Sequence, residues 1–184
     1  GPFPDPACGY KVSATQEVGV PILGGADTFT RTQGEFDKYF EIFKGQKIAL
    51  RLKAGAGHPK DRYLFYLGSD RELRGYNYKD IKGSAFVLGS FEYRFPLARD
   101  TDMRFFWQTF ILDQIQGVVF FDAGSAWFNS VFEPGFKKDA GLGLRFYFDV
   151  AGGTERVALR VDVARPFDGT DKDTHVWVGI NQAF

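Results

Sequence analysis

The sequence predicts an all-β protein, an eight-stranded antiparallel transmembrane β-barrel formed by one domain that spans residues 1–184. Three observations lead to this fold class. The chain holds 21 Phe, 8 Tyr, 3 Trp and 22 Gly, and aromatic residues are favoured in strands while glycine tolerates strand bends. Apolar and polar residues alternate with a period of two in most segments. No stretch reaches the roughly 18 to 20 apolar residues that a membrane helix needs, so any membrane crossing is expected to use strands.

The C-terminal third shows the alternation most clearly. In Glu155–Phe167, every second residue from Val157 to Val163 is apolar, and the residues between them are Ala, Arg and Asp. Ala140–Val150 and Val176–Phe184 repeat this pattern. Strict alternation over three successive segments is typical of strands. Five further segments alternate less strictly and complete the count at eight: Tyr10–Leu23, Thr28–Glu41, Gln46–Gly57, Ala85–Leu97 and Gly117–Trp127.

The connections between these strands differ in length. The connections after the second, fourth and sixth strands are short; the one after the fourth strand is Ala98–Asp102. The connections after the third, fifth and seventh strands are mostly longer; the one after the third strand is His58–Gly83. The link after the first strand, Gly24–Asp27, is the short exception. Short turns at one rim and long loops at the other are the habit of outer-membrane barrels. We interpret the apolar segment Met103–Gln116 as the lower part of the fifth strand, with a helical turn as the alternative.

Alternation alone does not decide which face of the sheet lies inside. A soluble, lipocalin-like barrel would turn the apolar face inward, whereas a membrane barrel turns it to lipid, where a charge costs roughly 2–4 kcal/mol at mid-bilayer. Two features favour the membrane. The polar faces mix both signs of charge with Gly and Ala, which suits a narrow interior, and the final strand ends on an aromatic residue. We therefore expect a barrel of the bacterial outer membrane whose terminal strand signal is made by Val176, Val178, Ile180 and Phe184.

Composition argues against several functions. Lys plus Arg and Asp plus Glu both number 23, so no net charge attracts nucleic acid. With His58, His175 and a single cysteine, Cys8, we expect no metal, no cofactor and no intrachain disulfide. No nucleophile–base pair or phosphate-binding glycine loop is recognisable, so we predict no catalytic residue and no enzyme activity. Glu92 and Asp122 could form a glycosidase pair, but a filled barrel interior leaves no room for a sugar.

Six short motifs follow one another along the chain: Leu73–Tyr76, Phe91–Leu97, Val119–Trp127, Gly141–Arg145, Leu159–Asp162 and Val178–Phe184. In this order they resemble the barrel of the BamA-type outer-membrane assembly factors, the bacterial surface antigen family. Pro2–Pro6 also resembles the turn before the ninth strand of that barrel. The resemblance covers nearly the whole chain, but only the last eight of the family's sixteen strands. Nothing in the sequence resembles the periplasmic POTRA domains that precede the barrel in that family.

The resemblance does not decide how the eight strands close or what the barrel does. Eight strands could close on themselves, two chains could pair to make sixteen, or the sequence could be a fragment. Because side chains just fill an eight-stranded barrel, we favour a closed monomer, with a homodimer second. The expected partners are outer-membrane lipid and other outer-membrane proteins. A role in protein insertion would use a weak seam between the first strand, near Val12–Val18, and the last, near Val176–Phe184. A purely structural or interaction barrel is the alternative, and a soluble lipocalin-like binder is the third.

The resemblance also implies a site inside the barrel, a lock for the long loop. In the family, the arginine of an Arg-Gly-Tyr/Phe loop motif dips into the lumen and meets acidic groups on the following strands. Carried over, Arg74 would meet Glu92 and Asp122, Gly75 would let the loop turn sharply, and Tyr76 would complete the motif. The strand pattern independently puts both carboxylates on the polar face. A buried guanidinium needs such partners, because its fork of N–H groups matches a carboxylate.

Alternatives exist for these side chains. Arg74 could stay on an exposed loop while Glu92 pairs with Arg94 or Arg145. Trp177, near a strand end, is interpreted as an interfacial anchor. If the contact of Arg74 forms, it is an architectural lock and not a catalytic site. The remaining charged residues expected on the polar faces are Arg51, Arg160, Asp149 and Asp162.

Overall fold

The computed structural model describes residues 8–20, 28–105, 109–128, 135–150, 155–168 and 173–181. In these ranges no helix is long and apolar enough to cross a membrane. The strands found there are β1 (Gly9–Gly19), β2 (Phe29–Phe43), β3 (Gln46–His58), β4 (Phe65–Leu67), β5 (Ile81–Gly83), β6 (Ala85–Ala98), β7 (Met103–Phe105), β8 (Phe110–Trp127), β9 (Lys137–Val150), β10 (Glu155–Pro166) and β11 (His175–Ile180).

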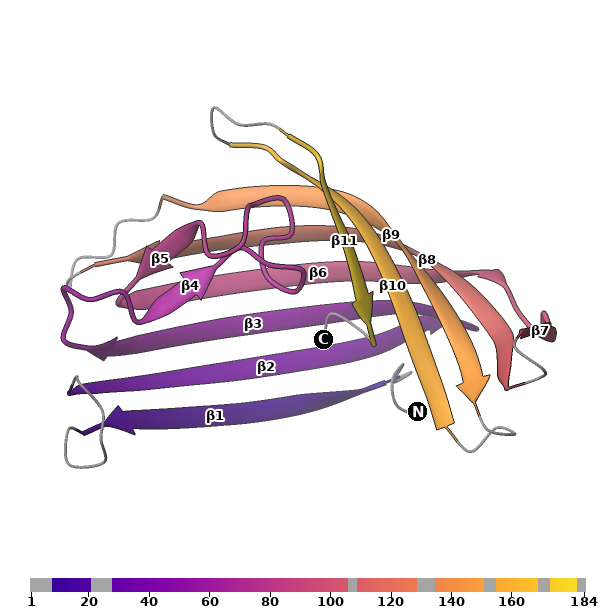
Figure 1. Ribbon diagram of the computed structural model, residues 1–184, viewed down its shortest axis with the longest axis horizontal. Helices are drawn as coiled ribbons and strands as arrows, with labels where there is room; N and C mark the ends of the chain where they lie inside the picture. Colours follow the sequence, from indigo (N-terminus) through magenta and orange to yellow (C-terminus); the bar gives the residue numbers. More distant parts are fainter. Residues whose placement is uncertain are drawn as a thin grey trace.

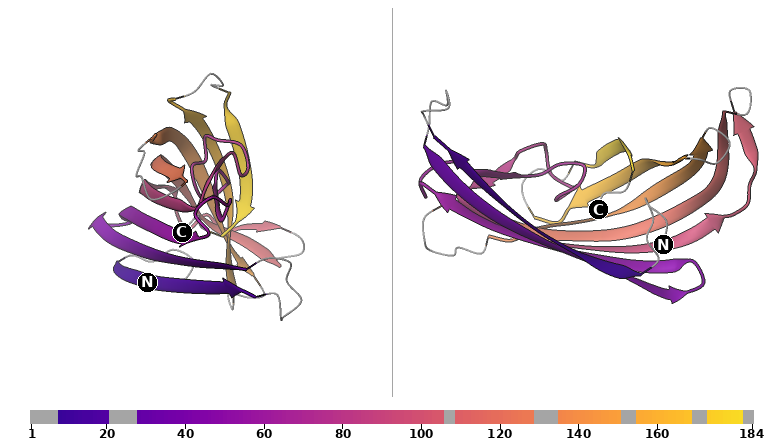
Figure 2. Two further views of the ribbon diagram at one scale, coloured as in Figure 1. Left: turned by 90° about the vertical axis from the view of Figure 1, so that its left-hand side faces the viewer. Right: turned by 90° about the horizontal axis from the view of Figure 1, so that it is seen from below.

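One large antiparallel sheet forms the body of the molecule. Its strand order is β1-β2-β3-β6-β8-β9-β10-β11, with β7 attached to β8. The eight long strands therefore lie in space in the order in which they occur in the chain, as in an up-and-down barrel. The sheet curls into a trough, and the short sheet of β4 and β5 lies over its concave side (Figures 1 and 2). The prediction of an all-β, antiparallel fold is confirmed.

The sheet is open at both ends. Within the described residues, β1 and β11 end the strand order and are not hydrogen-bonded to each other. β10 and β11 run steeply across the direction of β1, β2 and β3 in Figure 1. The structure thus shows the eight-strand wall that the sequence predicts, but not its closure into a barrel.

The two faces of the wall carry opposite chemistry. In β9, Leu142 and Leu144 are exposed on the outer face, with 64% and 39% of their surface accessible, while Arg145 and Tyr147 on the inner face are buried. The same alternation runs through β10, where Val163 is exposed and its neighbours are buried. A water-soluble barrel would bury the apolar set instead. Apolar outside and polar inside is the arrangement of a barrel wall that faces lipid.

The segment around residue 100 differs from the prediction. Met103–Phe105 forms β7, which pairs with the start of β8 on the side where β6 pairs further along. β7 therefore continues β6. The prediction that Met103–Gln116 belongs to the fifth strand is wrong for Met103–Phe105, because only the part from Phe110 onward lies in β8. The predicted turn at Ala98–Asp102 is an interruption within the strand, where Asp100 and Asp102 adopt positive φ angles. Aspartate tolerates this backbone region better than most residues, and a charged break of this kind looks like a turn in the sequence.

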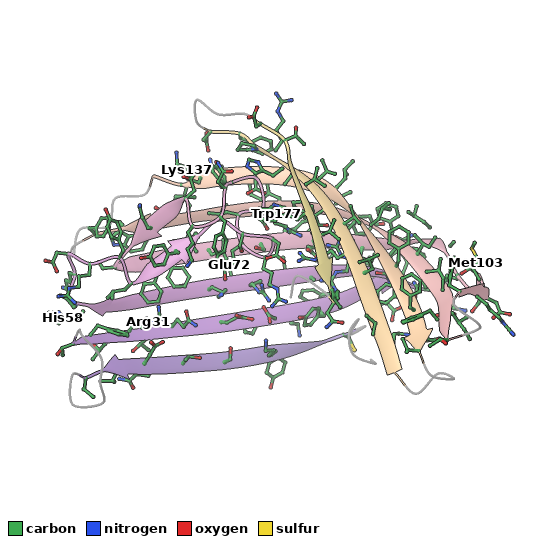
Figure 3. The ribbon with its side chains drawn as sticks, in the orientation of Figure 1. Arg31, His58, Glu72, Met103, Lys137 and Trp177 are labelled. Atoms are coloured by element: carbon green, nitrogen blue, oxygen red, sulfur yellow. The ribbon has the colours of Figure 1, made fainter. Side chains whose placement is uncertain are left out.

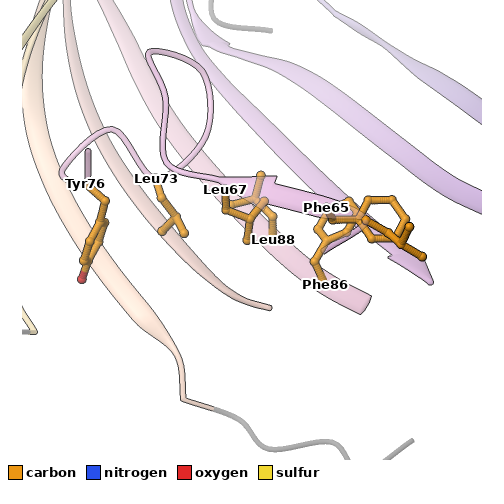
Figure 4. Packing of buried hydrophobic residues seen from close by; sticks show 7 residues of the cluster. Phe65, Leu67, Leu73, Tyr76, Phe86 and Leu88 are labelled. Carbon is orange, nitrogen blue, oxygen red and sulfur yellow. The ribbon is translucent and has the colours of Figure 1, made fainter. Parts of the chain in front are cut away.

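The long connection between β3 and β6, residues 58–83, is called the inner loop. It lies along the concave side of the trough and carries β4 and β5 (Figure 1). Its apolar side chains pack onto β6 and form the larger of the two buried apolar clusters among the described residues (Figure 4). That cluster contains Leu64, Phe65, Leu67, Leu73 and Tyr76 from the loop with Phe86 and Leu88 from β6. The main apolar core of the chain is therefore inside the trough, under the loop.

Close packing inside the trough leads to a first prediction. A Cβ atom added to Gly141 would lie 2.1 Å from the carbonyl oxygen of Val163 and 2.3 Å from Cζ of Phe120. Because a strand backbone and a buried ring cannot easily move aside, we expect Gly141→Ala to lower the free energy of unfolding by about 1–3 kcal/mol. Urea unfolding in detergent, followed by tryptophan fluorescence, measures this.

Gly89→Ala is the matched control. A Cβ atom at Gly89 meets nothing nearer than Cδ2 of Leu52, at 3.6 Å, so its unfolding midpoint should stay close to that of the wild type. Equal midpoints for the two variants would contradict the packing described around Gly141.

Candidate functional site

The local backbone of the inner loop presents Arg74 to the wall. Leu73 is fully buried and adopts a positive φ of 52°. The backbone N–H of Tyr76 donates to the carbonyl oxygen of Leu73 at 3.0 Å, which closes a turn around Arg74 and Gly75. Gly75 thus lies within this turn, where the motif implies it. Gly75 matters for another reason: a Cβ atom there would lie 2.5 Å from Cβ of Asp139 and 2.9 Å from the backbone nitrogen of Pro166. Glycine lets the loop backbone approach β9 and β10 closely.

The structure brings Arg74, Glu92 and Asp122 together. Arg74 donates from Nε and Nη2 to the two oxygens of Asp122, at 2.9 and 3.1 Å, and from Nη1 to Oε1 of Glu92 at 2.6 Å. A weaker contact of 3.5 Å reaches Oδ2 of Asp162 on β10. None of the four side chains is more than 1% exposed. The two-pronged contact with Asp122 uses the planar fork that only arginine has.

Further arginines surround this centre on the inner face. Arg94 contacts Oε2 of Glu92 at 2.7 Å, and Arg145 lies 3.7 Å from Oε1 of the same carboxylate. Glu92 therefore contacts both alternative partners and Arg74 at once. Asp162 accepts hydrogen bonds from Arg145 at 2.5 Å and from Arg160 at 3.2 Å. Such shared partners offset the loss of water that a buried charge suffers.

Phe120 completes the surroundings of Arg74. The centre of the guanidinium lies 3.5 Å from the centroid of the Phe120 ring, a stacking contact suited to a flat cation. Burial by itself would lower the pKa of Arg74, but the charges of Asp122 and Glu92 outweigh it, so the pKa is raised above its usual value. Arg74 is therefore a permanent cation inside the trough.

Side chains beyond Arg74 bind the inner loop to other strands. The Tyr76 hydroxyl accepts a hydrogen bond from the backbone N–H of Lys138 at 3.2 Å and lies 3.1 Å from its carbonyl oxygen. Burial raises the pKa of this hydroxyl. Glu72 pairs with Lys53 on β3, and Asp70 pairs with Arg160 on β10. The loop is thus fastened along much of its length, and not only at the motif.

Trp177 contacts the same loop from β11. Its indole Nε1 donates to the carbonyl oxygen of Arg74 at 2.7 Å, and the side chain lies on the inner side of the wall (Figure 3). The interpretation of Trp177 as an interfacial anchor is therefore wrong. On the same strand, a ring nitrogen of His175 lies 3.1 Å from Oδ1 of Asn77. The last strand of the wall is bonded to the loop as well as to β10.

The residues predicted as a terminal strand signal lie elsewhere. Val176, Val178 and Ile180 occupy the outer face of β11 and are 63%, 67% and 63% exposed, away from the Arg74 cluster. Phe184 falls outside the described residues. The predicted site residues therefore divide into an inner cluster and an outward-facing strand.

Sequence reasoning did not assign Asp162, Phe120 or Trp177 to the site. A usable signal existed, because strand alternation places all three on the inner face. What the alternation does not show is the path of the inner loop, which selects the side chains that Arg74 meets. Within the described part of the chain, no group of three or more His, Cys, Asp or Glu side chains is arranged to hold a metal ion. Each of Glu92, Asp122 and Asp162 bonds to at least one arginine. This geometry is suited to fixing the loop to the wall.

This geometry predicts a large effect of removing Arg74. Arg74→Ala leaves Glu92 and Asp122 buried without their shared cation, which we expect to cost about 3–5 kcal/mol of unfolding free energy. Arg74→Lys keeps the charge but loses the fork and should recover only part of the loss. Protection of the inner loop from protease, and urea midpoints in detergent, measure both effects.

Arg104→Ala serves as the matched control. Arg104 pairs with Asp102 at an exposed site, with 49% and 65% of the side chains accessible, and removing such a pair should cost less than about 1 kcal/mol. If Arg74→Ala were no more harmful than Arg104→Ala, the inner cluster would not be holding the loop.

A family model described as the Omp85 superfamily domain matches residues 3–184. The match includes every strand of the large sheet and the whole inner loop, and it confirms the predicted kinship with the BamA-type barrels. Members of this superfamily are outer-membrane proteins. The chain belongs to the Omp85 superfamily.

Proposed function

We propose that this chain forms the wall of a β-barrel in the bacterial outer membrane and takes part in inserting or organising other outer-membrane proteins. Its partners in this proposal are outer-membrane lipid and unfolded or neighbouring barrel proteins, with no nucleic acid, no cofactor and no catalytic residue. Membership of the Omp85 superfamily supports the outer-membrane location, because members of that superfamily are outer-membrane proteins. The observation that carries the proposal is the wall itself, which is apolar outside and polar inside and, in the described part of the chain, has no hydrogen-bonded partner at either edge.

The outer face supports contact with lipid. Exposed apolar side chains occur on the outside of every long strand from β1, with Val12, to β11, with Val178. The inner face holds the charged cluster, and the inner loop lies against it at β3, β6, β8 and β10. A lipocalin-like binder would need an apolar interior with room for a ligand, and here the interior contains charges and polypeptide. This distribution favours a membrane wall over a soluble barrel.

The unpaired edges support a role in insertion. Edge strands present rows of backbone N–H and C=O groups, which can template the pairing of another strand. Within the described residues, β1 offers such an edge along Gly9–Gly19 and β11 along His175–Ile180. These are the two strands between which the sequence predicts a weak seam. A client strand that pairs there would enter the membrane with its hydrogen bonds satisfied.

The Arg74 cluster has an architectural task in this proposal. It holds the inner loop against β6, β8 and β10, so the wall keeps its curvature while an edge engages a client. The alternative is a purely structural or interaction barrel, which the same cluster would also support. Activity in vesicles separates the two.

The membrane orientation can be tested with one charge placed at two depths. Leu144 lies near the middle of β9 on the outer face, whereas Leu97 lies near the end of β6 and is 56% exposed. In lipid vesicles we expect Leu144→Arg to lower folding stability by roughly 2–4 kcal/mol and Leu97→Arg by about 1 kcal/mol or less, because the cost falls toward the interface. Folding is measured by urea titration in vesicles. Two equally small effects would indicate a face that meets water.

The insertion role predicts faster folding of a client. Vesicles that contain the protein are mixed with a urea-unfolded eight-stranded outer-membrane barrel, and the heat-resistant folded form is followed on gels. We expect an increased rate relative to empty vesicles and to vesicles with an unrelated barrel at the same protein-to-lipid ratio. An unchanged rate would exclude insertion and leave the structural barrel.

A further inference from the structure

A small cavity lies where the inner loop meets β1 and β2. Its volume is about 240 Å³, which is below the roughly 300–1,000 Å³ of pockets that hold drug-sized ligands, so it suits a single small ring. Arg31 on β2 marks its position, near the end of the wall from which the inner loop starts (Figure 3). The lining includes Glu17 from β1, Phe29 and Arg31 from β2, and Tyr63, Leu64 and Tyr66 from the inner loop.

The two tyrosines of this cavity each carry a lysine on the ring. The neighbours of Tyr66 in β4 are buried against β6, whereas Tyr66 itself is 43% exposed and stands opposite Lys82 of β5. Nζ of Lys82 lies 4.8 Å from the centroid of the Tyr63 ring, and Nζ of Lys79 lies 5.3 Å from that of the Tyr66 ring. The exposed side of the β4–β5 sheet therefore places two cations and two aromatic rings beside the cavity.

These two lysines differ from the other cations inside the trough. Arg74 and Arg145, for example, both bond to carboxylates. In the part of the chain that the structure describes, neither Lys79 nor Lys82 forms an ion pair. Their charges are therefore available to an anion that enters from outside the chain.

The wall side of the cavity holds polar groups in fixed positions. Arg31 donates from Nε and Nη2 to Oε2 of Glu17, at 2.9 and 2.7 Å, and from Nη1 to the carbonyl oxygen of Leu64 at 2.8 Å. Among the described residues, Oε1 of Glu17 accepts no hydrogen bond, and the hydroxyls of Tyr63 and Tyr66 make none. One acceptor and two hydroxyls thus surround the cavity with their hydrogen bonds unmade.

We propose that this cavity binds a hexose ring that carries an acidic group, either a phosphate or a carboxylate. The C–H faces of a sugar ring pack against the electron-rich faces of aromatic rings, which Tyr63 and Tyr66 supply. The sugar hydroxyls bond to Glu17 and to the tyrosine hydroxyls, and the acidic group lies toward Lys79 and Lys82. A neutral sugar would not engage the lysines, and an inorganic anion would not engage the rings. This binding site goes beyond the proposed insertion role and does not depend on it.

Ligand-observed NMR tests this proposal on the whole protein, in a detergent without a sugar headgroup. The panel contains the phosphate esters of glucose, galactose and mannose, together with glucuronate, and compares them with neutral glucose. We expect saturation transfer from the protein to the ring protons of at least one acidic hexose, and much less to glucose. Inorganic phosphate should displace that hexose only at about tenfold higher concentration or more. Transfer to no acidic hexose, or displacement by phosphate at equal concentration, overturns the proposal.

Two variants locate the bound sugar. Tyr63→Leu removes an aromatic face and should weaken binding by about three- to tenfold. Lys79→Gln combined with Lys82→Gln removes both free cations and should weaken it by roughly tenfold. Folding is checked by heat-modifiable migration on gels. If Tyr63→Leu does not fold, the lysine variant decides, because its substitutions lie on the exposed side of the β4–β5 sheet.

A second lysine–tyrosine pair provides the matched control. Nζ of Lys38 lies 5.7 Å from the centroid of the Tyr10 ring, and neither residue lines the cavity. Tyr10→Leu combined with Lys38→Gln should therefore leave binding of the acidic hexose unchanged. Binding that the control weakens as much as the cavity variants do, or that no cavity variant weakens, would overturn the proposed site.

Competition distinguishes two sources of such a sugar, the headgroup of a glycolipid and a free saccharide. Lipopolysaccharide is added to the hexose complex either intact or after deacylation. Displacement by the intact form at the lower concentration indicates a lipid headgroup, whereas equal displacement, or none, indicates a free sugar. Both results retain the acidic hexose site. The client-folding assay tests the insertion role separately, so failure of one proposal is distinguishable from failure of the other.

Discussion

The bond between the Arg74 guanidinium and the carboxylates of Asp122 and Glu92 is the interaction on which the interior depends. Arg74 lies in the inner loop, between β3 and β6. Its partners Glu92 on β6 and Asp122 on β8 lie 18 and 48 residues further along the sequence. A buried guanidinium that has lost its hydration needs carboxylate partners. The inner loop can therefore lie only where Arg74 reaches Asp122 and Glu92. The surrounding arginines, the stacked ring of Phe120 and the glycine at position 75 all serve this contact, by balancing the charge or by giving the loop space.

The distribution of polar and apolar side chains is the reverse of that in a water-soluble domain, because arginines are buried and many large apolar side chains are exposed. The described residues bury their main apolar cluster between the inner loop and β6, while the largest fully buried side chains are Arg74, Arg94, Arg145 and Arg160. In the proposed membrane wall, lipid contact would remove the need to bury the outer leucines and valines, which are exposed. Cohesion of the interior then rests on shared hydrogen bonds, whose value depends on every member having a partner.

The sequence allowed the strands to be predicted because alternation is a local property: a residue such as Leu142 or Arg145 reveals its face from its neighbours alone. The meeting of Arg74 with Glu92 and Asp122 was expected only through resemblance to a family, since no local pattern tells where a long loop goes. The open edges and the continuation of β6 into β7 were not predicted, because they depend on the space inside the sheet and on the φ angles of Asp100 and Asp102. The inward turn of Trp177 depends on a carbonyl group that the loop brings to it.

In the proposed membrane wall, two requirements compete. Hydrocarbon demands that β1 and β11 find partners, and the shortest way would be for them to meet each other. The inner loop occupies the space through which the sheet would have to contract, and it is held there by bonds to β3, β6, β8, β10 and β11. Breaking those bonds would leave several buried charges without partners, whereas adding strands at the edges disturbs none of them. In this proposal the bonds of the inner loop therefore oppose contraction of the wall around its own interior, and they leave its edges free to accept a further strand.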